Sequence, residues 1–163
     1  MKTTALGILG PATLFLSSCF FLSPALASAI QVNVFQGKAI QVVKPNGTKA
    51  EKVIPAEGVV PGDTVVYRYI VNNRGTAVAD GVVVDTAIDP NMRYVDGSAT
   101  AYGAEFSVDG GAVFGRQDDL TVLDVDGTFR NAMPQDITNI RWRLKHAVAP
   151  GRPFSVGFRA VLK

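Results

Sequence analysis

Residues 67–86, YRYIVNNRGTAVADGVVVDT, decide the fold that this 163-residue chain is expected to adopt. The first part of the stretch alternates apolar and polar side chains, with the two-residue period of a strand that buries one face. The run Asn72-Asn73-Arg74-Gly75 then breaks the alternation with residues that are typical of turns. A second alternating segment follows the break. The stretch therefore predicts a strand, a turn and another strand.

Each of these two strands has one set of side chains that we expect to be buried. In the first strand, over residues 64–72, this set is Val65, Tyr67, Tyr69 and Val71. In the second strand, the set is Val78, Val82, Val84 and Ile88.

The carboxyl-terminal residues carry the same pattern. The side chains expected to face the core in the first of two further strands are Ile140, Trp142 and Leu144. Pro150-Gly151 is a strong turn signal, and an alternating strand follows over residues 154–162. The basic-face candidate described below requires these last two strands to pair as a hairpin. The predicted neighbours of Trp142 in the core are Tyr67, Tyr69 and Phe158.

Shorter strands and frequent turns occupy most of the remaining chain. Strands are predicted over residues 92–95, 104–108, 112–114 and 120–125, with one or two more over 30–43 and a mobile loop over 44–62. Sustained helical periodicity is absent from the sequence. These features predict an all-β chain folded as an antiparallel β-sandwich. The expected divisions are a signal peptide over 1–29, amino-terminal strands with the mobile loop over 30–57, and the sandwich core over 58–163.

The amino-terminal run is typical of a secretory signal peptide. Lys2 supplies a positive start, the following residues are apolar or small, and small-x-small patterns predict cleavage after Ala27 or Ala29. A retained membrane anchor is an alternative that Pro11 and Pro24 disfavour. No later apolar run is long enough to span a bilayer, so we expect no transmembrane anchor after processing.

A lipoprotein is a second alternative for this run. Residues 16–19 resemble a bacterial lipobox, in which Cys19 becomes a lipidated amino terminus, but the apolar residues that follow are unusual for a lipoprotein. Cys19 is the only cysteine of the chain. After cleavage at either predicted site, the mature protein would therefore have no thiol, which excludes disulfides, cysteine nucleophiles and thiolate metal sites.

Motifs within residues 61–98 carry a family resemblance. These motifs are Pro61-Gly62-Asp63, a Tyr-containing strand over 67–71, Asn73-Arg74-Gly75, a Val-rich strand over 82–85, Pro90, and Tyr94-Val95-Asp96-Gly97-Ser98. In them the chain resembles the bacterial conserved-repeat family catalogued as domain of unknown function number eleven, and the resemblance extends over residues 58–163. It implies an immunoglobulin-like sandwich exported to the cell envelope, and it brings no catalytic residues.

Six residues are expected to specify the fold. We expect Asp63 to accept a bond from a nearby backbone N–H, and Asp85 to accept similar bonds at its strand end. Asn73 and Gly75 are expected in a turn that needs positive φ angles. The two aromatic members of the set, both expected in the core, are Tyr67 and Trp142.

A basic face is the first candidate binding site. Its members are Arg141, Arg143, Lys145, Arg159 and Lys163. They would form one ladder of positive charges if the last two strands pair as a hairpin. Such a ladder is suited to phosphate, lipopolysaccharide or another polyanion. The alternative is a solvated sheet face whose charges discourage aggregation.

Aspartates near glycines form a second candidate, a calcium site. Its potential ligands are Asp118, Asp119, Asp124 and Asp126. Calcium prefers convergent oxygen ligands, but the spacing does not match an EF-hand loop, and solvated turns are the alternative. The only histidine, His146, is expected at a partly exposed strand end; no local Gly-x-Ser-x-Gly motif supports a histidine-dependent triad.

Together these features predict a non-enzymatic, exported domain with a structural or adhesive role. We expect it in the periplasm, on the cell surface or outside the cell, in contact with envelope or surface proteins and without a cofactor. The alternative is a module that binds polysaccharide or another polyanion through the basic face, and a hydrolase with an unrecognised site is a third class. A net charge of +2 gives no support for nucleic-acid binding.

Overall fold

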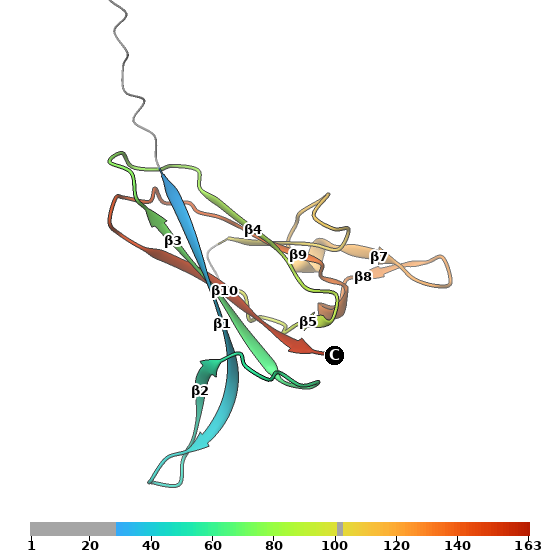
Figure 1. Cartoon of the computed structure of the whole chain (residues 1–163). Coiled ribbons are helices and arrows are strands. Elements are labelled where there is room, and N and C mark those ends of the chain that lie inside the picture. The colour runs from blue at the N-terminus through green and yellow to red at the C-terminus, as the bar shows by residue number, and fades with distance from the viewer. Residues whose placement is uncertain (1–28, 101–102) are drawn as a thin grey trace, which may run out of the picture.

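The computed structural model describes residues 29–100 and 103–163. The predicted cleavage after Ala27, the lipobox and Cys19 lie outside the described residues. The described residues are all-β, and their strands pair antiparallel (Figure 1). The strands are β1 (Ile30–Val43), β2 (Lys49–Pro55), β3 (Thr64–Asn73), β4 (Val83–Ala87), β5 (Met92–Tyr94), β6 (Ala104–Ser107), β7 (Thr121–Leu123), β8 (Phe129–Asn131), β9 (Asn139–Arg143) and β10 (Phe154–Leu162). Two short 3-10 helices are η1 (Gln117–Asp119) and η2 (Pro134–Asp136).

Two sheets and one ribbon contain these strands. The larger sheet has the order β2-β1-β3-β10-β5, and the smaller has the order β4-β9-β6. β7 and β8 form a separate two-stranded ribbon, which projects away from both sheets (Figure 1). The two sheets share one apolar core, so their arrangement is that of a β-sandwich.

Aromatic side chains from both sheets meet in this core. Trp142 of β9 is fully buried, with its ring centroid 6.0 Å from that of Tyr69 on β3 and 6.4 Å from that of Phe158 on β10. Tyr94 of β5 lies 5.4 Å from Phe106 of β6. The strand alternation around Trp142 therefore predicted the buried face correctly.

The carboxyl-terminal hairpin that the basic ladder requires does not form. β9 pairs with β4 and β6 in the smaller sheet, whereas β10 pairs with β3 and β5 in the larger one. Residues 144–153 therefore carry the chain from one sheet to the other. Alternation identifies a strand with a buried face, but it does not identify the partner, because both sheets bury apolar side chains in the same core.

Val78 is also placed differently from its prediction. β4 starts only at Val83, and Val78 is exposed. Its neighbour Ala79 is buried instead, because Ala79 forms an isolated bridge with Val148 and so takes the inward position. Val84 and Ile88 are buried as predicted.

Three shorter segments differ from the sequence-based prediction. The mobile loop over residues 44–62 contains β2, which pairs with the second half of the single long strand β1. Residues 112–114 form no strand, although the adjacent Gly115 bridges Phe106. Strand β8 was not predicted. Within the described residues, no helix is long and apolar enough to cross a membrane.

Candidate functional site

The β7–β8 hairpin starts from a buried residue and ends in a short turn. Leu120, just before β7, is buried in the core, and the Ala132 N–H donates to its carbonyl at 2.9 Å. Gly127 has a φ of 83°, which favours glycine, at the turn between the strands. The Asp126 carboxylate accepts bonds from both the N–H and the hydroxyl of Thr128, at 2.9 and 2.6 Å. Local hydrogen bonding thus determines the shape of the turn.

Apolar side chains are exposed at the end of this hairpin. Leu123 and Phe129 lie opposite each other in the β7–β8 register and are 64% and 75% exposed. Val125, in the turn between them, is also fully exposed. We call these three residues the hairpin tip. Single exposed apolar residues are common, but three on one projecting ribbon are typical of a contact surface.

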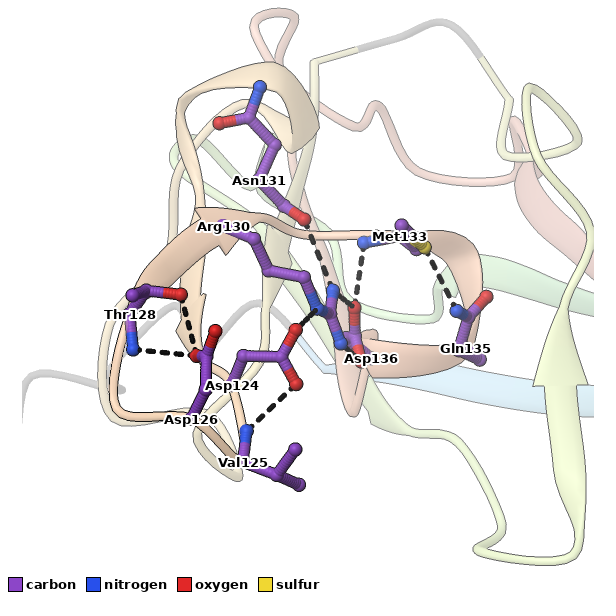
Figure 2. Close-up of polar contacts among 9 residues, drawn as sticks. All are labelled: Asp124, Val125, Asp126, Thr128, Arg130, Asn131, Met133, Gln135 and Asp136. Carbon is purple, nitrogen blue, oxygen red and sulfur yellow. Dashed lines mark hydrogen bonds and ion pairs between the residues drawn. The ribbon is translucent and has the colours of Figure 1, made fainter.

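Arg130 of β8 braces the hairpin from its other face (Figure 2). Its guanidinium Nη1 and Nη2 donate to the two carboxylate oxygens of Asp136, at 2.6 and 3.1 Å. The Nε of Arg130 lies 3.3 Å from a carboxylate oxygen of Asp124, in the turn. One cation therefore joins the turn to η2. This matters because an isolated two-stranded hairpin is only marginally stable in water.

The opposite charges of Arg130 and Asp136 stabilise each other. The hydrogen bond from Arg130 lowers the pKa of the Asp136 carboxyl below its ordinary value; burial opposes the shift, and the Met133 N–H adds to it. The Asp136 carboxylate in turn raises the pKa of Arg130. The bidentate pair is therefore charged at neutral pH, and it is lost only in acid, as the pH falls through the lowered pKa of Asp136.

The four aspartates of the predicted calcium site do not converge. Among the described residues, no group of three or more acidic, histidine or cysteine side chains is arranged to hold a metal ion. Asp124 pairs with Arg130 and Asp126 bonds Thr128, while Asp118 and Asp119 lie in η1. The acidic residues of the turn stabilise the hairpin itself.

The five basic residues do not form one ladder, because β9 and β10 lie in different sheets. Three of them are ion-paired: Arg141 with Asp85, Arg143 with Glu105, and Arg159 with Glu51, at 2.6, 2.9 and 2.6 Å. The Lys163 ammonium donates to the Pro90 carbonyl at 2.7 Å. The three ion pairs compensate the charges of Arg141, Arg143 and Arg159, which weakens the attraction of these side chains for a polyanion.

Lys145 lies elsewhere, in a cavity of about 610 Å³ at the end of the sandwich. Leu144, Val148 and Phe154 contribute apolar surface, and the basic or titratable members of the lining are Lys145, His146 and Arg152. No acidic side chain of the described residues lines this cavity. His146 is exposed there, beyond the end of β9.

Among the residues expected to specify the fold, Asp63 makes the contact predicted for it. The Asp63 carboxylate accepts the Val60 N–H at 2.8 Å and pairs with Lys38. Tyr67 stacks on Phe158, with the ring centroids 4.7 Å apart. Asp85 differs from its prediction, since it accepts from the Arg141 side chain on the neighbouring strand rather than from a strand-end backbone.

Asn73 and Gly75 act differently from the prediction as well. Neither has a positive φ angle. Asn73 is buried, and its side-chain amide donates to the carbonyls of Ala77 and Val148 at 2.7 and 2.8 Å. Its Oδ1 accepts the Gly75 N–H at 2.9 Å. The amide hydrogen bonds of Asn73, rather than left-handed backbone angles, hold this turn.

Sequence reasoning missed the hairpin tip and its brace. Residues 120–125 were predicted as a strand of the sandwich, but no partner strand was assigned. The Asp126-Gly127 dipeptide, with apolar Val125 before it and Phe129 two residues after it, is the signal that could have identified the hairpin. Nothing in the spacing of Asp124, Arg130 and Asp136 indicates the ion-paired brace.

No family model, curated protein or solved structure matches this chain. The resemblance to the bacterial conserved-repeat family stays a prediction from the motifs within residues 61–98.

Proposed function

We propose that this chain is a non-enzymatic, exported, immunoglobulin-like β-sandwich with a structural or adhesive role in the bacterial cell envelope, and that the hairpin tip contacts a protein there. The observation that carries the proposal is the exposure of Leu123, Val125 and Phe129 on a ribbon that projects from both sheets. The brace by Arg130 reduces the entropy that binding would otherwise cost, because the ribbon is already ordered.

The other parts of the proposal have separate support. Export and an envelope location are supported by the signal-peptide pattern that ends at Ala27 or Ala29. The immunoglobulin-like topology is supported by the motifs within residues 61–98, together with two antiparallel sheets that share a core. Absence of catalysis is proposed because the family that the chain resembles has no agreed catalytic residues.

A protein surface fits the hairpin tip better than an anionic membrane does. Asp124 and Asp126 flank Val125 in the turn, and Asp118 and Asp119 precede β7. Negative charges next to the apolar residues are repelled by anionic headgroups, whereas basic residues usually accompany membrane-binding segments. We therefore expect a partner with an apolar patch and a basic rim.

The proposal predicts that polar changes at the tip abolish a specific contact. Leu123→Ser with Phe129→Ser should reduce capture of one defined envelope protein from the native host at least tenfold, because the contact loses its apolar area. Arg130→Met should weaken capture too, since the ribbon loses its brace. Capture is measured by pull-down from solubilised envelope, with quantitative mass spectrometry.

Val113→Ser is the matched control for this experiment. Val113 is 64% exposed, like Leu123, but lies in the loop after Asp109, outside the hairpin. The control should capture as much of the same protein as the wild type. Equal capture by all variants, or binding of the wild type to anionic vesicles instead, would contradict the assignment of the hairpin tip as a protein contact.

We propose binding of an anionic group in the cavity as a second candidate function, retaining the polyanion or polysaccharide ligand expected from sequence. The observation that favours it is the grouping of Lys145, His146 and Arg152 around a cavity that no acidic side chain of the described residues lines. This placement moves the candidate site from the outer strand face to the end of the sandwich.

A salt series with heparin as the probe tests this second candidate. Binding should weaken steeply as salt rises, because counterions are released with each contact. Lys145→Ser with Arg152→Ser should abolish binding, whereas Arg143→Ser should retain it, since Arg143 is paired with Glu105 outside the cavity. Absence of heparin binding by the wild type at low salt would remove this candidate.

A further inference from the structure

The first half of β1 has one hydrogen-bonding edge without a partner strand in the described part of the chain. β1 pairs with β3 over Ile30 to Ala39, but β2 pairs with β1 only from Gly37 onward. On the side where β2 lies, the edge from Ile30 to Gln36 therefore faces outward. This segment, IQVNVFQ, contains no proline and no charged residue.

The backbone directions along this edge follow from the register. The Arg74 N–H donates to the Ala29 carbonyl, so the odd-numbered residues at the start of β1 direct their N–H and C=O groups to β3. Even-numbered residues point the other way, as the Lys44 N–H does when it donates to Thr48 beside β2. The outward-pointing backbone groups of the free segment belong to Ile30, Val32, Val34 and Gln36.

Apolar side chains accompany these free backbone groups. Val32 and Val34 lie opposite Val71 and Tyr69 of β3, and so share the core-facing side of the larger sheet. They are nevertheless 43% and 55% exposed. Natural edge strands are usually protected by charges, prolines or bulges, because an apolar uncharged edge accepts another strand. The edge of β1 has neither of the first two protections.

We propose that this edge pairs with the same edge of a second copy, antiparallel about a two-fold axis at Asn33. Antiparallel hydrogen bonding requires that the outward-pointing residues face each other, so Val32 of one copy lies opposite Val34 of the other. The same register places Ile30 opposite Gln36. All seven residues of the free edge are then paired, and the four valines cluster on the core-facing side.

Self-complementarity is what selects a second copy over another extended chain. The register opposes Val32 to Val34 on either side of the axis and brings no like charges together, because the segment has none. Pairing ends at Gly37, where Pro55 of β2 already occupies the edge. The length of the free edge therefore matches the length of the strand that it would accept. The inference is independent of the hairpin tip, and it joins the larger sheets of two molecules into one.

Cysteine cross-linking tests the register. Asn33 is opposite itself across the proposed axis, in a pair where the Cα atoms are about 4.5 Å apart, within the range of a disulfide. Asn33→Cys, in a full chain that also carries Cys19→Ser, should therefore form a disulfide-linked dimer in air, detected by non-reducing electrophoresis. Gln31→Cys and Phe35→Cys, in the same Cys19→Ser background, should each form no disulfide-linked dimer alone but cross-link when mixed, since residue 31 of one copy faces residue 35 of the other.

A second variant separates pairing from folding. Val34→Pro removes an N–H that points away from β3, so the fold should persist while the dimer, measured by analytical ultracentrifugation, is lost. Several outcomes would overturn the inference. These are a monomeric wild type, equal cross-linking of all three single variants, cross-linking at residue 31 or 35 alone, and a dimer that survives Val34→Pro.

Discussion

Trp142→Ala should lower the free energy of unfolding by about 3–5 kcal/mol, the range found when a large aromatic side chain is removed from a core. Trp142 is fully buried between the sheets, beside Tyr69 and Phe158. Its indole N–H also donates to the Thr100 carbonyl at 3.3 Å. The loss is a large share of a domain stability of about 5–15 kcal/mol, and a chain with one cysteine has no intramolecular disulfide to compensate.

Circular dichroism in a urea series is the suitable measurement, because Trp142 is the only tryptophan and its fluorescence disappears with the substitution. Arg143→Ala is the control on the same strand. Arg143 is exposed and its ion pair with Glu105 is at the surface, so the expected loss is about 0–1 kcal/mol. If both variants unfold at the wild-type urea concentration, the burial of Trp142 contributes nothing and the core assignment is wrong.

The strands that the sequence predicted well are those with long alternation. β3 was expected over residues 64–72 and ends at Asn73, and its buried set includes Val65, Tyr69 and Val71. The alternation within such a strand shows which side chains share the buried face, because the period of two depends only on that strand. The partner of a strand depends on distant residues, so the alternation does not show that β9 and β10 lie in different sheets.

The candidate site was harder to predict from the sequence, because it also depends on the tertiary structure. The hairpin tip is marked by exposure, and Leu123 and Phe129 look like core residues when only their type is considered. The brace by Arg130 joins a carboxylate of the β7–β8 turn to one of η2, and this proximity arises only in the tertiary structure. The free edge of β1 likewise depends on where β2 stops, and β2 lies within a segment that was predicted as a loop.

Asn73→Ala should have the second large effect, a loss of about 2–4 kcal/mol. The substitution removes three hydrogen bonds of a buried side chain, and each such bond contributes about 0.5–1.5 kcal/mol. These bonds tie the end of β3 to the following turn at Ala77 and to Val148, which lies on the path from β9 to β10. The loss therefore affects the junction between the two sheets.

Asn72→Ala is the neighbouring control, with a side chain on the opposite face of β3, and it should change stability far less. Asn73→Asp sharpens the test. A charged carboxylate cannot donate to the Ala77 and Val148 carbonyls, but its protonated form can donate once, so the pKa of the introduced carboxyl should be raised in the folded protein. Stability linked to a raised pKa is present in acid and lost as the pH rises. In urea unfolding, the deficit of Asn73→Asp relative to wild type should therefore shrink between pH 7 and pH 4. A deficit that is equal at both values, together with a harmless Asn73→Ala, would show that the amide of Asn73 does not hold the sheets together.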